Sequence, residues 1–185
     1  MKRSLDVLFA SLLFAAVTVF GLPLRASADE GKNAESEISE ALAELSKADR
    51  AAAEAQRYCA VRTGHRLGSM GAPVKVNVAG QEVFVCCRGC SKKATANATA
   101  TLDSVKKLKK IAASLAKLPA EDRQLAEAQR FCAVAGKNRL GSMGTPVKLV
   151  INGQPVFLCC GACTDKANAH PRETLAKAAE LKKAK

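Results

Sequence analysis

The chain has 185 residues and a formal net charge of +12, and it contains eight Cys, six Phe, one Tyr and no Trp. These few aromatic side chains leave almost no surface on which nucleobases could stack. The positive charge therefore does not predict nucleic-acid binding. The sequence also lacks a Ser-His-Asp order, a phosphate-binding glycine loop and a recognisable carboxylate pair. We therefore do not predict an enzyme.

The first 28 residues have the pattern of a secretory signal peptide. Lys2 and Arg3 precede an apolar run over residues 7–20, and Ala26-Ser27-Ala28 supplies the small residues that a signal peptidase requires. The apolar run is shorter than the roughly 20 residues of a membrane-spanning helix, which disfavours an uncleaved membrane helix. We expect cleavage after Ala28, a secreted or periplasmic location, and no stable membrane insertion of the remaining protein.

The rest of the chain is a tandem duplication. Residues 49–93 match residues 122–166 without a gap, at an offset of 73 residues, and all eight cysteines lie in these two copies. We predict two small modules, residues 29–110 and residues 111–185. Domains of this size often depend on a metal or on disulfides because their hydrophobic core is small.

Each module is predicted to begin with one helix or a helix pair. Ile38, Leu42 and Leu45 recur at helical spacing, and the alanine-rich segment 48–56 has high helix propensity. In the second copy Pro119 suits the first position of the corresponding helix. A glycine-rich irregular segment follows in both copies and contains Leu-Gly-Ser-Met-Gly, at residues 67–71 and 140–144.

A β-hairpin is predicted after this irregular segment. Apolar and polar residues alternate from Val74 to Val78, and Asn152-Gly153 marks a two-residue turn in the second copy. Pairing about the turn sets residues 74, 76 and 78 opposite residues 85, 83 and 81. Three cysteines and a helix follow, so the predicted class is α+β, with two zinc-ribbon-like modules that each have a hairpin and a cysteine knuckle flanked by helices.

Residues 102–118 are predicted to join the modules as a helix. The segment lacks glycine and has apolar residues at helical spacing. Its lysines 106, 107, 109 and 110 are interpreted as a solvated helix face, with contact to an anionic envelope surface as the alternative.

The eight cysteines are the candidate metal ligands. They are Cys59, Cys86, Cys87 and Cys90 in the first module and Cys132, Cys159, Cys160 and Cys163 in the second. Thiolates favour soft or borderline ions, so zinc or copper(I) is the predicted cofactor and the metal ion the predicted partner. The main alternative is a disulfide-stapled structural or interaction protein of the cell envelope, because an exported protein meets an oxidising environment. A redox-active dithiol is a third interpretation.

The consecutive pair Cys86-Cys87 separates these interpretations in part. Consecutive Cα atoms lie about 3.8 Å apart, below the usual disulfide range, so the two thiols are poor partners for each other. Side chains alternate along a strand, so we expect one of these two thiols to be spare, and Cys59 and Cys90 to be ligands in either register.

The cysteine segments resemble a known family. Residues 80–90 and 153–163 are similar to the "G-x-x-Y-x-F-C-C-x-G-C" end of YHS and TRASH-type metal-binding domains, and Cys59-Ala60-Val61 is similar to their opening "C-P-V", with Ala in place of Pro. The resemblance implies a hairpin knuckle with a flanking helix that handles or senses heavy metals, often copper or zinc. It implies the following ligands: Cys59, Cys86 and Cys90, then Cys132, Cys159 and Cys163, with Cys87 and Cys160 as additional candidates.

Two further residue types could take part in a metal site. A thioether favours copper(I) over zinc, but we expect Met70 and Met143 to be buried residues of their loops, because methionine commonly fills irregular gaps. His65 and His170 each face an asparagine in the other copy. Neither histidine is therefore expected to be a ligand common to both sites.

The gapless repeat predicts that the modules fold and bind independently. A fragment from about Ser114 to Lys185 is expected to fold and take up one metal, with metal binding and folding coupled as in other small thiolate sites. Circular dichroism of the fragment during a Zn(II) titration under reducing conditions would test this. A fragment that stays unfolded in saturating Zn(II) while the longer chain folds would indicate one shared site.

Overall fold

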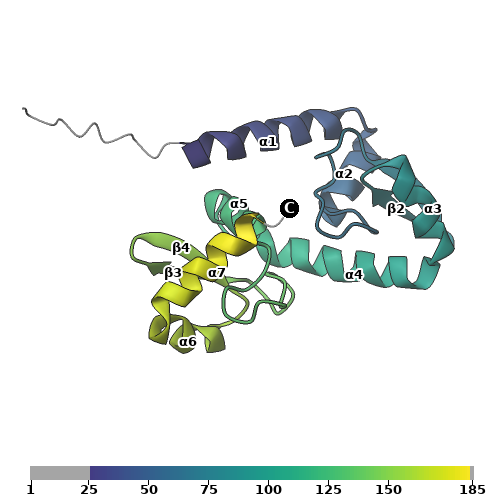
Figure 1. Cartoon of the computed structure of the whole chain (residues 1–185). Helices are drawn as coiled ribbons and strands as arrows, with labels where there is room; N and C mark the ends of the chain where they lie inside the picture. Colours follow the sequence, from purple (N-terminus) through teal and green to yellow (C-terminus); the bar gives the residue numbers. More distant parts are fainter. Residues whose placement is uncertain (1–25, 184–185) are drawn as a thin grey trace, which may run out of the picture.

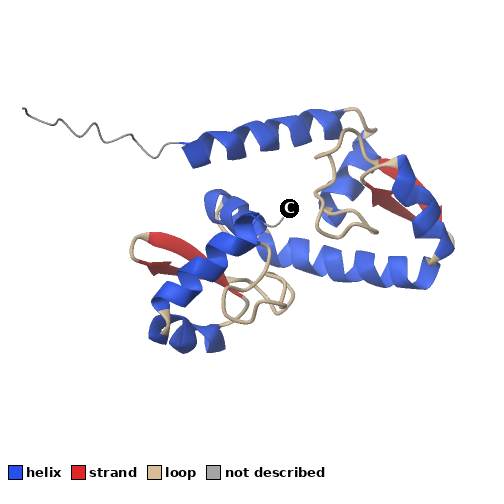
Figure 2. Ribbon diagram, viewed as in Figure 1, coloured by secondary structure: helices blue, strands red, loops and turns tan. Residues whose placement is uncertain are grey.

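The computed structural model describes residues 26–183, with side chains from residue 33, so the predicted signal peptide lies almost wholly outside the described residues. The chain forms two antiparallel hairpins, each surrounded by helices, which confirms the predicted α+β class (Figures 1 and 2). The elements are α1 (Ala26–Ala43), α2 (Lys47–Gln56), β1 (Val74–Val78), β2 (Gln81–Val85), α3 (Arg88–Ala96), α4 (Ala98–Leu115), α5 (Ala120–Gln129), β3 (Val147–Ile151), β4 (Gln154–Leu158), the 3-10 turn η1 (Gly161–Cys163), α6 (Thr164–Ala169) and α7 (Pro171–Lys183). Among these described helices, none combines the length and apolarity needed to span a membrane.

Both hairpins have the register that the alternating pattern predicted. Val74 pairs with Val85 and Val78 with Gln81, and β3 and β4 repeat this pairing. The two turn residues have positive φ in each copy, 47° and 82° at Ala79-Gly80 and 50° and 74° at Asn152-Gly153. This is the type I′ turn, whose twist matches that of the paired strands.

The second strand of each hairpin is buried at its end. Val83, Phe84 and Val85 are at most 2% exposed, and helices α2 and α3 both contact β2. Phe157 and Leu158 of β4 are equally buried. The chain therefore carries the cysteine that follows each strand directly into the core.

The helical segments agree with the prediction in part. Residues 44–46 separate α1 from α2, which gives the helix pair that was one of the two expected arrangements. The Ser46 hydroxyl accepts a hydrogen bond from the backbone N–H of Asp49 at 3.2 Å, which caps α2. Pro119 lies one residue before α5 rather than in its first position. The helical region after Cys90 is divided at Asn97 into α3 and α4.

Helix α4 belongs to both modules. Leu102 and Val105 in its first half pack in the core of the first module, whereas Leu108, Ile111 and Leu115 pack in the core of the second. The helix therefore crosses the predicted boundary at residues 110 and 111 (Figure 1). A fragment that begins at Ser114 lacks Leu108 and Ile111, so one that begins at Ala98 should be the more stable.

The modules also contact each other through polar side chains. The carboxylate of Glu127 is 7% exposed and accepts hydrogen bonds from Arg57 and, at 2.6 Å, from Arg66. The second module also supplies Arg139, whose guanidinium lies 4.3 Å from the ring centroid of Tyr58 in the first module. Tyr58 itself packs with the second core. These contacts, together with α4, fix how the two modules are oriented.

The duplicated Leu-Gly-Ser-Met-Gly loop presses its first glycine against a helix. Gly141 has φ +87°, and a Cβ at that position would lie 2.9 Å from the carbonyl oxygen of Ile111 in α4. Gly68 makes the equivalent approach to Ile38 in α1, also at 2.9 Å. Only glycine allows the loop backbone to come this close.

This close approach predicts a large effect of a single methyl group. Gly141→Ala should lower the free energy of unfolding by about 3 kcal/mol, because it adds backbone strain and overpacks the contact with α4. Chemical denaturation of metal-saturated protein would measure this. Gly153→Ala is the matched control, since Gly153 has φ +74° but open space around it, and it should cost about 1 kcal/mol. Equal losses in the two variants would contradict the close packing.

Candidate metal centre

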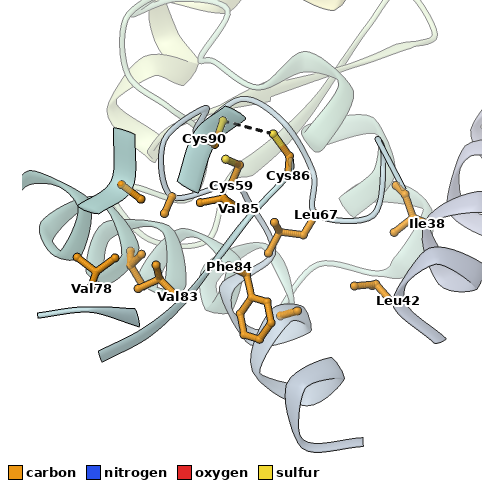
Figure 3. Packing of buried hydrophobic residues seen from close by; sticks show 14 residues of the cluster. Ile38, Leu42, Cys59, Leu67, Val78, Val83, Phe84, Val85, Cys86 and Cys90 are labelled. Carbon is orange, nitrogen blue, oxygen red and sulfur yellow. Dashed lines mark hydrogen bonds between the residues drawn. The ribbon is translucent and has the colours of Figure 1, made fainter. Parts of the chain in front are cut away.

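Three thiols in each module come together from two separate parts of the chain. Cys59 lies in the loop after α2, Cys86 directly follows β2, and Cys90 lies in the first turn of α3. Their side chains point toward one another at the edge of the first core (Figure 3). Cys132, Cys159 and Cys163 occupy the corresponding places in the second module, and no cysteine of either triad comes from the other module.

The spacing of the sulfurs suits a metal ion. Within each triad all three sulfurs lie within 4.8 Å of one another. The Cys86 and Cys90 sulfurs are 3.9 Å apart, and the sulfurs of Cys132 and Cys163, like those of Cys159 and Cys163, are 3.8 Å apart. Four thiolates around zinc, with Zn–S bonds of about 2.3 Å, form a tetrahedron whose edges are about 3.8 Å. These three sulfur pairs therefore already have the separation of two corners of such a shell, and the remaining pairs within each triad lie within 4.8 Å.

The fourth cysteine of each module lies beside the triad. The Cys87 sulfur is 4.0 Å from that of Cys86 and 3.8 Å from that of Cys90, but it is not within 4.8 Å of all three triad sulfurs. Cys160 has the same relation to Cys159, at 3.9 Å. Strand β2 ends at Val85 and strand β4 ends at Leu158, so neither strand includes the consecutive cysteines that follow it. The alternation of side chains along a strand, from which we expected one spare thiol, therefore does not apply to these cysteines. Cys87 is thus as close to Cys86 and Cys90 as two corners of a tetrahedral shell are to each other, and only its distance from Cys59 exceeds 4.8 Å. Binding of one ion by all four sulfurs of this module would require Cys59 and Cys87 to move closer together.

Backbone groups donate to the first cysteine of each triad. The N–H of Arg62 lies 3.2 Å from the Cys59 sulfur, and the N–H of Ala135 lies 3.4 Å from the Cys132 sulfur. Such donors stabilise a thiolate more than a thiol. At Cys132, burial by itself would raise the pKa, but the N–H groups of Ala135, Cys159 and Val134 lower the pKa overall.

The other triad thiols favour the protonated form when no cation is near. Burial raises the pKa of Cys86, and the neighbouring Cys59 adds to this increase. Burial likewise raises the pKa of Cys90, and it raises the pKa of Cys163 to about 12, with Cys132 adding to the increase. Thiolates packed this closely repel one another in a medium that solvates charge poorly. A bound cation would remove that repulsion, so metal binding should release protons.

All eight cysteines are free thiols in the structure. The first triad is buried throughout, with Cys59, Cys86 and Cys90 at 0%, 1% and 3% exposure. In the second triad Cys163 is only partly buried, although Cys132 and Cys159 are as buried as their counterparts. The two triads thus consist of corresponding cysteines and differ in access from solvent.

A buried glutamine holds each site in position. This residue was not identified from the sequence. The side-chain N–H₂ of Gln56 donates to the carbonyl oxygens of Tyr58 and Phe84 at 2.8 and 2.6 Å, and its oxygen accepts from the N–H of Phe84 at 2.9 Å. Gln129 makes the same three bonds to Phe131 and Phe157. This glutamine bridge joins the end of α2 to the residue before Cys59 and to β2 near Cys86. The repetition of a glutamine three residues before the first cysteine of both copies was the signal that could have revealed it.

The methionines and histidines lie elsewhere than the triads. Met70 and Met143 are 51% and 59% exposed, so the expectation that they are buried loop residues is wrong. The preceding leucines, Leu67 and Leu140, are 1% exposed and fill the space under the loops instead. His65 and His170 belong to neither group of converging ligands among the described residues.

Comparisons with family models, with curated proteins and with solved structures found no match for this chain. The similarity to YHS and TRASH-type domains therefore remains a prediction. The geometry of the two triads supports a metal centre.

The glutamine bridge generates a test of how the site is held. Gln129→Ala should lower the free energy of unfolding by about 3 kcal/mol, because three hydrogen bonds to the backbone of Phe131 and Phe157 are lost, two of them in the buried core. It should also weaken metal binding at the second site by about tenfold, the effect of losing a group that orients a ligand. Chelator competition and denaturation would measure both. Gln154→Ala, at an exposed residue of β4, is the control, and equal behaviour of the two variants would contradict the role of the bridge.

The difference between the vicinal thiols generates a second test. Cys86→Ser should weaken metal binding at the first site by more than about 100-fold, since Cys86 is one of the three converging ligands, whereas Cys87→Ser should weaken it by no more than about tenfold. Competition with a chromophoric chelator would give both affinities. Equal and severe losses would show that both sulfurs bind the ion.

Proposed function

We propose that this protein is an exported, non-catalytic metal-binding protein that holds one soft ion, zinc or copper(I), in each of its two modules. The observation that carries the proposal is the convergence of three thiols in each module, five of the six fully buried, with all sulfurs of a triad within 4.8 Å of one another and three pairs at the edge length of a tetrahedral thiolate shell. Thiolates are the preferred ligands of these ions in proteins.

Burial supports binding rather than catalysis. The sulfurs of the first triad lie in the core, where an ion can be held but an organic substrate cannot reach them. The carbonyl of Phe84 accepts from the Ala60 N–H at 3.2 Å, in addition to its bond with Gln56, so the segments that carry Cys59 and Cys86 are joined to each other. A site with such fixed walls suits retention of an ion.

Export is proposed from the first 28 residues. Basic residues, an apolar run and a small-residue end are the three parts of a signal peptide. An oxidising compartment would compete with the metal by forming disulfides, and a disulfide-stapled envelope protein is the alternative that such a location favours. We also propose that the two modules are related to YHS and TRASH-type metal-binding domains.

Native mass spectrometry of residues 29–185, produced under reducing conditions with zinc and then with copper(I), tests the proposal. We expect two added metal ions and eight thiols that react with iodoacetamide after unfolding in chelator. A protein that carries no metal and has lost eight hydrogens would instead have four disulfides, and would support the alternative.

A further inference from the structure

An exposed methionine lies at the outer side of the second metal centre. The side chain of Met143 is 59% exposed, although methionine is among the residue types most often buried. The loop does not need this side chain for packing, because Leu140 is 1% exposed and Gly141 touches the backbone of α4. The side chain is thus accessible to a ligand from solvent.

One amide group lies between this thioether and the triad. The Asn138 Nδ2 atom is 3.6 Å from the Met143 Sδ atom and 3.8 Å from the Cys159 Sγ atom. Asn138 therefore contacts both the exposed sulfur and a sulfur of the metal centre. Because Cys163 of the same triad is partly buried rather than fully buried, this site is the more accessible of the two.

A cationic cleft adjoins the same amide. A cleft of about 460 Å³ is lined by Lys107, Lys110, Lys137 and Arg139 together with Asn138 and Ser142. Among its described lining residues, none carries a carboxylate. The field of these cations disfavours the approach of a free metal cation and favours an anion. A metal that arrives here should therefore arrive within an anionic complex.

We propose that the second centre is loaded with copper(I) by an anionic donor, with Met143 as the first protein ligand. This inference rests on the proposed metal-binding function and names the metal and the route of entry. A thioether binds copper(I) well and zinc poorly, which selects copper(I). The Met143 sulfur binds the ion as a donor ligand leaves. Thiolates of Cys159, Cys163 and Cys132 then replace the thioether, the thiol protons pass to solvent, and copper stays in the +1 state throughout.

The rate of copper uptake tests the route. Residues 29–185 would be mixed, without oxygen, with the anionic copper(I) complex of bicinchoninate, and loss of the complex would be followed by stopped-flow absorbance. Met143→Leu should slow the phase that belongs to the second site by about tenfold, while two copper ions are still bound at the end. Met70→Leu is the matched control and should leave that phase unchanged. Zinc uptake should be the same in all three proteins.

The outcomes separate this proposal from the proposed function. If two copper ions bind and Met143→Leu loads as fast as the unaltered protein, the route through Met143 is wrong and the metal-binding function stands. If no copper binds to either protein, the proposed function fails and the route with it.

The charge of the donor is tested with a double variant of the cationic cleft. Lys107→Gln combined with Lys110→Gln should slow copper loading from the anionic complex and remove much of the salt dependence of the rate. An unchanged rate would overturn the anionic donor.

Discussion

The glutamine bridge is the interaction on which each module depends. Gln56 and Gln129 each form hydrogen bonds to three backbone groups, and those groups belong to the two segments that carry the triad. A short hairpin has little stability of its own. The bridge, the buried end of the second strand and the helix after the cysteines together keep three thiols close in a module with a small core. The same groups that stabilise the fold therefore also prepare the site.

The two modules form one structure without sharing a site. Helix α4 supplies apolar residues to both cores, and Glu127 of the second module forms salt bridges with Arg57 and Arg66 of the first. Each triad nevertheless draws its three sulfurs from a single module. This arrangement lets the sites keep the same ligands while their surroundings differ. The first triad is fully buried, whereas the second lies beside exposed Met143 and a cationic cleft.

Local patterns were enough to predict the hairpins and the region of the site. Asn152-Gly153 and the alternation of valines determine the register through neighbouring residues only. Whether Cys86 or Cys87 joins Cys59 and Cys90 depends on where β2 ends and α3 begins. The ends of helices and strands are poorly encoded in a sequence. The contact between Arg57 and Glu127 joins residues 70 positions apart and leaves no periodic trace. The exposure of Met143 followed from Leu140 filling the space beneath the loop, which only tertiary packing decides.

We propose that each triad forms the inner ligand shell of one metal ion. Three thiolates gathered in a low-dielectric core repel one another unless a cation neutralises them, so a bound ion would stabilise the deprotonated triad. X-ray absorption spectroscopy of the zinc-loaded protein tests this most directly. The account predicts a first shell with at least three sulfur atoms per zinc, at about 2.3 Å. A first shell made mainly of nitrogen and oxygen atoms at about 2.0 Å would contradict it.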